Sequence, residues 1–442
     1  LFMPEIFEFG IIGMGPAGIG MAMSLCSTSD NIKNTICFER GSYPNEKICS
    51  AFLQNECCYS NVCTVISGIG GASTLSSGKI SNFPAGSGLV EFFDSEQQLK
   101  DLLNEIILFF SNKIALKKVE IDSEIKKHTQ EFYDQRHIKY KYYDIYEFDG
   151  KNYRNFIQET IQGLRDNGLQ ILDNSVVVDI NRDPSTLYFR VIVKTPSGER
   201  AFLIRNLILA TGALDIQDRL LEKMIGSVKN FYEIGVRIEA PASAFGNTLS
   251  THGDLKLKLG SGRTYCVTAN GKIISYQTGG AMFLEGSMEP SEATNYTNLA
   301  VLIKCNDDKE IQNFIKRYYK GFRGRPVKQR LVDYINGRIS SDTINTTLTS
   351  AICGDINTLL PPFINDTMKG FIDDVILDAM GIPKEVVVVV APELKILRNL
   401  QLAENFELDK NLVVIGAATG KFRGILQSFC SGVRCGRLLS RE

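Results

Sequence analysis

The sequence has little net charge, little histidine and no long apolar run. Across 442 residues, 49 Lys and Arg stand against 50 Asp and Glu, and there are only three histidines. The net charge of -1 favours neither a nucleic-acid partner nor an anionic membrane surface. The longest apolar stretch, residues 9–26, is interrupted by five glycines and a proline, so we expect no membrane-spanning helix.

Targeting and redox signals indicate a reducing compartment. Near the amino terminus, no basic segment precedes an apolar run with a small-residue cleavage site, so we expect a cytoplasmic protein. The eleven cysteines, an odd number, fit reduced thiols better than a disulfide framework. At this length the chain suits two or three domains rather than one core.

The first forty residues predict a βαβ unit. An apolar strand over 7–12 leads into a glycine turn, a small-residue helix to about Cys26 and a second strand over 35–39. Ser95 and Gln98 form a capping box ahead of an apolar helical stripe, and further helices are expected at 121–133 and 152–164.

The second half of the chain alternates between strand signals and a mixed region. A period-two pattern predicts a meander of strands at 176–180, 188–194 and 200–204, followed by an apolar strand at 207–209. The mixed segment 216–384 is interpreted as a separate cap or substrate domain. A run of five valines within 385–390 predicts a strand buried on both faces, and a strand at 412–415 precedes a closing helix at 424–439.

The glycine turn is the strongest motif. Gly13-Met14-Gly15-Pro16-Ala17-Gly18 matches G-x-G-x-x-G between a strand and a helix. The first glycine permits the tight turn, the second lets a pyrophosphate approach the backbone, and the third allows close packing of helix on strand. Amides at the helix start then bind the phosphates. The alternative is a turn that serves packing only.

Glu39 ends the second strand, twenty-one residues after Gly18. A carboxylate at this position is placed to accept hydrogen bonds from the ribose hydroxyls, and it repels a 2′-phosphate. The unit therefore predicts an adenosine-diphosphate dinucleotide other than NADP at this site.

Further motifs resemble known families. The opening motif through Glu39-Arg40-Gly41, the meander, the Ala210-Thr211-Gly212 turn and the last strand with Gly416 are similar to the glutathione-reductase-type FAD fold. The segments 63–79, 234–239, 263–267 and 391–395, with Leu359-Leu360-Pro361, resemble a bacterial family of uncharacterised FAD-dependent dehydrogenases. These stretches span most of the chain.

The glycine turn and this resemblance together imply FAD as the cofactor. The residues expected to bind it are Gly13, Gly15, Pro16, Ala17, Gly18, Glu39, Arg40, Gly71, Ser77, Lys79, Val177, Ala210, Thr211, Gly212, Gly416, Gly424, Ile425 and Leu426. Two positions depart from the pattern: Ser77 replaces the family's Asp, and Ala417 replaces the acid usual after the glycine of the last strand. A degenerate member that binds FAD weakly or no longer turns over therefore stays open.

The sequence signals for a catalytic group are weaker than those for cofactor binding. In flavoenzymes the flavin carries the redox chemistry, and the start of the last helix, 424–426, would direct backbone amides at the ring. Lys79 is a weak catalytic candidate, with a solvated surface lysine as the alternative.

A cysteine pair and a basic-aromatic run carry rival hypotheses. Cys58 and Cys63 have the spacing of the redox disulfide in flavin disulfide reductases, but a second G-x-G-x-x-G and a carboxy-terminal His-Glu pair are absent. No metal site is expected. The run 137–143 could stack nucleobases, but an alternating edge strand explains it as well, and we prefer that interpretation.

We therefore predict an α/β protein with a Rossmann-like FAD-binding domain of ββαββ type, formed by a parallel sheet and a β-meander. This domain covers 1–215, with a helical insert at about 90–150, and resumes at 385–442 around a mixed α+β cap domain at 216–384. The predicted function is an FAD-dependent oxidoreductase or dehydrogenase that transfers hydride or electrons between a small organic substrate and FAD. NAD(P)H or a protein is left open as the electron partner, and no nucleic-acid or membrane partner is expected. The alternatives are a dithiol-disulfide reductase using Cys58 and Cys63, or a flavin-binding protein without turnover.

Overall fold

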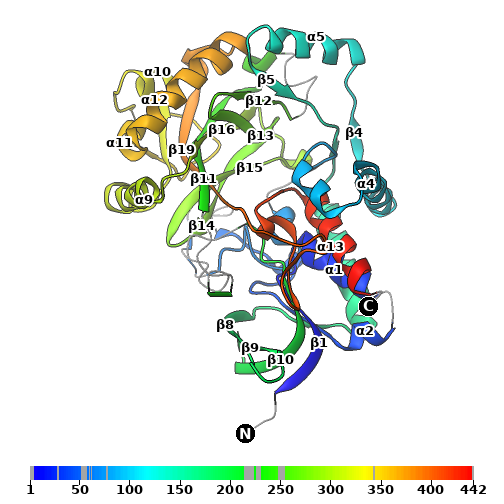
Figure 1. Cartoon of the computed structure of the whole chain (residues 1–442). Coiled ribbons are helices and arrows are strands. Elements are labelled where there is room, and N and C mark those ends of the chain that lie inside the picture. Colours follow the sequence, from blue (N-terminus) through cyan, green and yellow to red (C-terminus); the bar gives the residue numbers. More distant parts are fainter. Residues whose placement is uncertain are drawn as a thin grey trace.

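The computed structural model describes residues 4–26, 29–50, 57–58, 60, 62–75, 78–213, 223–224, 230–246, 254–341 and 344–440. Two eight-stranded sheets form the centres of two domains, which stack one above the other in Figure 1. Among these residues, no helix has both the length and the apolar character needed to cross a membrane.

The first domain is built on a largely parallel sheet in the order β20-β21-β10-β1-β2-β7. Its central strands β1, β2, β7, β10 and β21 run parallel, and β20 pairs antiparallel with β21 at one edge. The bounds are β1 (Glu5–Ile12), β2 (Thr35–Phe38), β7 (Gln170–Leu172), β10 (Gly198–Leu209), β20 (Glu407–Asp409) and β21 (Leu412–Val414). The strand order confirms the predicted Rossmann-like α/β class.

The predicted meander is present, but its third strand is longer than expected. β8 (Val176–Arg182), β9 (Phe189–Thr195) and the first half of β10 pair in sequence. The second half of β10 then pairs with β21, while β1 pairs along most of its length. The two strands expected at 200–204 and 207–209 are therefore one continuous strand.

Helices cover the first sheet and begin close to the expected positions. They are α1 (Pro16–Leu25), α2 (Ser29–Lys33), α4 (Glu96–Ser111), α6 (Gly150–Asp166) and α13 (Ile425–Leu439). At the start of α4, the Ser95 hydroxyl accepts a hydrogen bond from the Gln98 amide at 3.2 Å, as the capping signal predicts. The Gln98 side chain instead reaches the amide of Asp94 at 3.1 Å.

Helices α1 and α13, far apart in sequence, lie side by side (Figure 1), and their backbones approach closely at two glycines. A Cβ atom on Gly20 would lie 2.4 Å from the carbonyl oxygen of Phe429, and one on Gly432 would lie 2.1 Å from that of Ala17. Only glycine permits this approach. The contact fixes the carboxy-terminal helix beside the helix that follows the glycine turn.

The second domain has a mixed sheet in the order β18-β17-β19-β11-β16-β13-β12-β5. Its neighbouring strands pair antiparallel, except for the parallel pair β17 and β18. The bounds are β5 (Lys139–Lys141), β11 (Asn230–Pro241), β12 (Lys256–Leu259), β13 (Gly262–Thr268), β16 (Tyr296–Cys305), β17 (Val327–Arg330), β18 (Ile352–Cys353) and β19 (Val388–Arg398).

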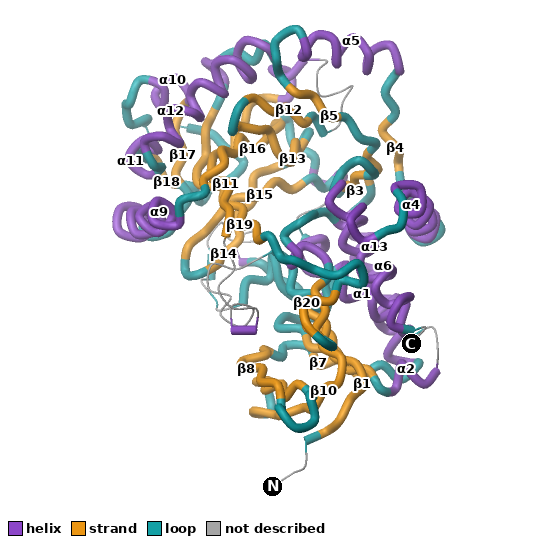
Figure 2. The backbone as a smooth tube through the Cα atoms, viewed as in Figure 1, coloured by secondary structure: helices purple, strands orange, loops and turns teal. Residues whose placement is uncertain are grey.

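This sheet has two chemically different faces. On β11, Ile234, Val236 and Ile238 belong to the apolar core, while Glu233 and Arg237 alternate with them and point to the other side. Figure 2 shows helices gathered along the apolar side of the sheet. They are α5 (Ser123–Asp134), α9 (Asp308–Phe322), α10 (Leu331–Ile335), α11 (Ile356–Leu359) and α12 (Pro362–Phe371), which continues as a π-helix over Ile372–Ala379.

Two small sheets complete the described structure. β14 (Lys272–Thr278) and β15 (Ala281–Ser287) form a hairpin, and β3 (Lys79–Ser81), β4 (Lys117–Val119) and β6 (Ile145–Glu147) form a three-stranded sheet. Short 3₁₀ turns connect the elements, among them Gly71–Thr74 and Gly416–Thr419.

The sheet membership of two strands differs from the expected division of the chain. β19, which contains part of the valine run, pairs with β11 and β17 in the second sheet, so the chain returns to the first sheet at β20 rather than at residue 385. β5 comes from the amino-terminal half but pairs with β12 at the edge of the second sheet. The edge-strand interpretation of 137–143 is therefore confirmed.

The α1–α13 contact predicts the effect of two matched substitutions. Gly20→Ala places a methyl group against the Phe429 carbonyl, and we expect it to lower the free energy of unfolding by about 1–3 kcal/mol because the helices must separate. Gly163→Ala, in the last turn of α6 with no atom within 4 Å of the new Cβ, should stabilise the protein by up to about 1 kcal/mol. Urea unfolding of both variants measures the difference, and equal effects would contradict the packing argument.

Candidate functional site

A cavity of about 1290 Å³ lies between the two domains. Its lower wall consists of the glycine turn, the 210–213 turn and the starts of α1 and α13, and its upper wall consists of the charged face of the second sheet. Among the described lining residues are ten Lys and Arg but only three Asp and Glu. This excess of cations contrasts with the nearly neutral chain and favours an anionic occupant.

The three glycines of the turn have the distinct roles that the motif predicts. Gly13 has φ of +97°, and a Cβ there would lie 2.5 Å from the Ala210 carbonyl oxygen. A Cβ on Gly18 would lie 2.0 Å from the oxygen of Gly13, so this glycine permits the close packing of helix on strand. Gly15 differs because its nearest neighbour would be the Gly71 Cα at 3.9 Å, and Gly15 lines the cavity. The backbone at Gly15 is thus accessible to a ligand.

Glu39 holds three backbone segments together. Its Oε1 accepts hydrogen bonds from the amides of Gly41 at 3.0 Å and Gly68 at 2.8 Å, and its Oε2 accepts one from Met14 at 2.8 Å. A carboxylate offers about four acceptor positions, so one position on Oε2 stays open to a hydroxyl group. Glu39 lines the cavity with 5% of its surface exposed.

The glycine-rich loop at 67–74 lies against the turn. The Gly70 amide donates to the Met14 carbonyl at 2.7 Å, and Arg40 Nε donates to the Ser67 hydroxyl at 2.7 Å. Behind the loop, the buried Lys47 donates from Nζ to the Gly71 carbonyl and the Thr74 hydroxyl, each at 2.7 Å. These contacts place Gly71 and Ser67 on the cavity wall.

The start of α13 also opens onto the cavity through Gly424, Ile425 and Gln427. Gln427 is 1% exposed, and its Nε2 donates to the carbonyls of Ser81 at 2.7 Å and Ala85 at 3.2 Å. Within the described residues its Oε1 accepts no hydrogen bond. A buried amide oxygen without a donor is costly, and here it can accept from an N–H group of a bound molecule. With the start of α1, two helix amino termini face one cavity.

Most of the predicted cofactor residues meet at this cavity. Those that line it are Gly13, Gly15, Pro16, Glu39, Arg40, Gly71, Lys79, Val177, Ala210, Thr211, Gly212, Gly424 and Ile425. Four others, Ala17, Gly18, Gly416 and Leu426, are packed behind the wall. Ser77 lies outside the described residues.

Lys79 connects the two domains rather than standing on the surface. From β3 its Nζ donates to the Val267 carbonyl of β13 and lies 3.5 Å from Asp254 Oδ2. Asp254 also accepts hydrogen bonds from the Tyr143 hydroxyl at 2.9 Å and the Val267 amide at 3.1 Å. Burial raises the pKa of Asp254, but Lys79, Lys256 and these hydrogen bonds outweigh it and lower the pKa below its ordinary value.

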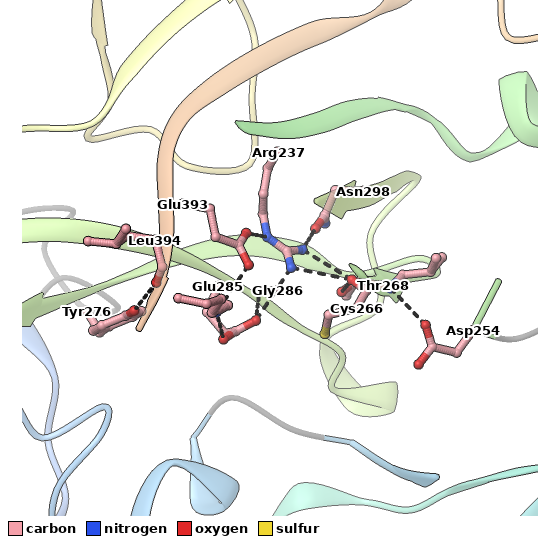
Figure 3. A network of polar contacts seen from close by, with 12 residues as sticks. Arg237, Asp254, Cys266, Thr268, Tyr276, Glu285, Gly286, Asn298, Glu393 and Leu394 are labelled. Carbon is pink, nitrogen blue, oxygen red and sulfur yellow. Dashed lines mark hydrogen bonds and ion pairs between the residues drawn. The ribbon is translucent and has the colours of Figure 1, made fainter. Parts of the chain in front are cut away.

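A buried charge network forms part of the upper wall (Figure 3). Arg237 Nε donates to Glu393 Oε2 at 2.7 Å, and Arg237 Nη2 lies 3.5 Å from Glu285 Oε1. Lys395 Nζ lies 2.6 Å from Glu285 Oε2 and 3.1 Å from Glu393 Oε1. Burial alone would lower the pKa of Arg237, but Glu393, Cys266 and Glu285 raise it above its ordinary value. The network is charge-balanced, and Glu285 and Lys395 present its polar edge to the cavity.

The sequence analysis singled out the segments 137–143 and 263–267 but did not assign their residues to the site, and several of them line the cavity. Tyr265 lies beneath the amino group of Lys256 at 4.5 Å and the guanidinium of Arg263 at 4.7 Å, measured to the ring centroid. Burial raises the pKa of Tyr265 to about 12, so its hydroxyl stays protonated near neutral pH. The strict alternation of Leu255, Lys256 and Leu257 was the available signal, since it marks a strand with one apolar and one charged face.

The two predicted redox cysteines do not line the cavity. Cys58 is exposed and Cys63 is partly buried, with its Sγ accepting a hydrogen bond from the Gln277 amide at 3.3 Å. Both are free thiols. Hydrogen bonds from Ser60 lower the pKa of Cys58. No group of His, Cys, Asp and Glu in the described part of the chain could hold a metal ion.

Comparison with known proteins gives weak similarities. No protein-family model matches the sequence, and no curated protein matches it. A glycine oxidase from Geobacillus kaustophilus is 14% identical with a TM-score of 0.39, over 99% of this chain and 95% of that chain. A flavoprotein/dehydrogenase from Cytophaga hutchinsonii is 12% identical with a TM-score of 0.39, over 99% and 78%. An anhydrotetracycline hydroxylase from Streptomyces rimosus is 10% identical with a TM-score of 0.38, over 98% of this chain and 62% of that chain.

The chain thus spans less than two thirds of the hydroxylase. Because these similarities are weak, the class assigned here rests on the chain's own topology. The protein is an α/β protein with a Rossmann-like first domain and a second domain inserted into it. The sequence resemblance to the FAD-dependent dehydrogenase family stays a prediction.

Lys47 predicts a specific pH dependence of stability. Burial lowers its pKa from 10.5 to about 7, although Glu39 and Cys63 act in the opposite direction. Between these two values the unfolded chain binds one proton that the folded chain does not. The free energy of unfolding should therefore rise with pH across this window, by up to about 1.4 kcal/mol per pH unit from this group.

Urea unfolding of the parent and of Lys47→Met between pH 6.5 and 9.5 measures this contribution. The parent should gain stability relative to the variant as the pH rises. Lys113→Met, at an exposed lysine, serves as the control and should follow the parent. If the difference in free energy of unfolding between the parent and Lys47→Met does not change with pH, the prediction of a buried, neutral Lys47 is wrong.

Proposed function

We propose that the protein binds FAD in the cavity between its domains and is an oxidoreductase for a small organic substrate. The observation that carries the proposal is the convergence of the glycine turn, the Glu39 carboxylate and the start of α13 on one cavity. Bound FAD would supply the redox chemistry, because its ring system accepts and donates electron pairs. The residues of the chain would bind it, orient it and exclude water.

The residues present fit such a group. The accessible backbone at Gly15 and the start of α1 suit a pyrophosphate, and the open acceptor position of Glu39 suits a ribose hydroxyl. At the other end, the Gln427 oxygen and the amides that begin α13 suit the polar edge of the flavin. Ala417 also lines the cavity, so the usual acid at this position is absent and backbone groups would hold the ribityl chain.

The substrate would meet the flavin from the side of the second domain. Tyr265 and Tyr276 line the cavity there, next to the polar edge formed by Glu285 and Lys395. Tyr276 donates from its hydroxyl to the Leu394 carbonyl at 3.4 Å, which fixes its ring against the wall. Hydride or electron transfer needs close approach and exclusion of water more than it needs a proton relay. NAD(P)H or a protein stays open as the electron partner.

The first test is the visible spectrum of the purified protein and of Gly15→Ala. We expect bound FAD that bleaches with dithionite under anaerobic conditions and recovers in air. The Gly15 methyl group meets no neighbour closer than 3.9 Å, so the variant should fold normally, yet it occupies the space that the pyrophosphate needs. FAD affinity should fall at least about tenfold.

Gly163→Ala is the matched control and should bind FAD like the parent, since Gly163 lies on α6 away from the cavity. A colourless protein that also fails to bind added FAD would refute the proposal. A flavin that binds but is reduced by no organic donor would support the alternative of a flavin-binding protein without turnover.

The dithiol-disulfide alternative makes a separate prediction. Because Cys58 and Cys63 do not line the cavity, a Cys58→Ser/Cys63→Ser variant should take up and release the same number of electrons per flavin as the parent. Anaerobic dithionite titration with thiol counting measures this. A loss of two electron equivalents in the variant would favour the dithiol reductase.

A further inference from the structure

Four lysines stand opposite one another at the upper end of the cavity. In the antiparallel pair of β5 and β12, Lys141 is directly opposite Lys256 and Lys139 is directly opposite Lys258. All four line the cavity, and we call them the lysine patch. On the far side of β12, Arg263 stands opposite Lys258 and extends the row of cations onto β13.

The arrangement is unfavourable for the protein alone. Like charges directly opposite each other on neighbouring strands destabilise a sheet. Within the described part of the chain, no carboxylate forms an ion pair with a lysine of the patch, whereas Arg263 is paired with Glu233. The nearby Asp254 is already held by Lys79 and Tyr143. Burial lowers the pKa of Lys141, and burial together with Arg263 and Lys79 lowers the pKa of Lys256, although Asp254 raises it.

Protection of a sheet edge does not explain the patch. Lysines on an edge strand prevent pairing with other chains, and this accounts for Lys139 and Lys141 on β5. It does not account for Lys256 and Lys258, because β12 is paired on both sides. Their partners in the alternation, Tyr140 and Leu257, are in the apolar core, so the lysines are directed to the cavity face.

The patch is separate from the place proposed for the dinucleotide. The glycine turn belongs to the first domain, while β5 and β12 belong to the sheet of the second domain and lie near the top of Figure 1. The same cavity is lined by both, and Tyr265 also lines it, with Lys256 over its ring. A molecule that extends from Tyr265 toward β5 would bring its far end to the lysine patch.

We propose that the lysine patch binds the anionic end of the substrate, and that the substrate is a small molecule with at least two negative charges, carried by carboxylate or phosphate groups. This inference rests on the proposed function, because it assigns the class of substrate that enters the same cavity. A small molecule fits better than a nucleic acid because the lysines line the same cavity as two buried tyrosines, Tyr140 and Tyr143. Opposite charges at such a site attract each other, and salt weakens the attraction.

The test measures anion binding and flavin content on the same samples. The probes are citrate, which carries carboxylates, and inorganic tripolyphosphate, studied by titration calorimetry at fixed ionic strength with the protein as purified. Lys139→Gln/Lys258→Gln should weaken binding of the preferred probe at least about tenfold. The matched control, Lys113→Gln/Lys384→Gln, removes two exposed lysines that do not line the cavity and should leave binding unchanged.

The outcomes separate this inference from the proposed function. Tighter binding of citrate would support a polycarboxylate substrate, and tighter binding of tripolyphosphate would support a phosphorylated one. Equal weakening in both double variants, or none in Lys139→Gln/Lys258→Gln, would overturn the inference even if the flavin is present. A twelve-nucleotide oligothymidylate that binds through the patch more tightly than either probe would overturn it in favour of a nucleic acid. A protein that neither carries flavin nor binds added FAD, but still binds the probe through the patch, would refute FAD binding and support the anion site by itself.

Discussion

The backbone contact between α1 and α13 is the constraint on which the lower half of the cavity depends. Gly20 and Gly432 leave no room for a side chain, so the two helices lie at one separation only. One helix follows the glycine turn and the other closes the chain, and their amino termini therefore open onto the same space. The dipoles of the two helices make this wall favourable for negative charge.

The second domain forms the opposite wall of the cavity, because apolar and charged side chains alternate along the strands of its sheet. Its sheet places apolar side chains under the helices and charged side chains toward the cavity, and the Arg237 network is the buried part of that charged face. Four charged groups can stay buried there because each faces a partner of opposite sign. Within the described residues, the lysines of β5 and β12 form no ion pair with a carboxylate, and in this they differ from the Arg237 network.

Much of the fold was predictable because its signals are local. The glycine turn, the meander and the helices α4, α5, α6 and α13 each depend on spacing within a short segment. The strand built from the valine run was also predicted, but it was assigned to the first sheet. A strand buried on both faces has the same composition in either sheet, and only its pairing with β11 and β17 shows where it belongs.

In the candidate site too, some features follow from local sequence signals and others from long-range contacts. The sequence by itself determined the glycine turn, the acid at the end of β2 and the small-residue turn at 210–212, because each needs a particular residue at a particular backbone position. Only the tertiary structure decided that Lys79 reaches Asp254, that Cys58 and Cys63 lie off the cavity, and that Lys139 faces Lys258. Those facts depend on contacts between residues more than one hundred positions apart, or on which surface a loop presents. Residue spacing in the sequence predicts neither the long-range contacts nor the surface that a loop presents, because both depend on packing across the whole chain.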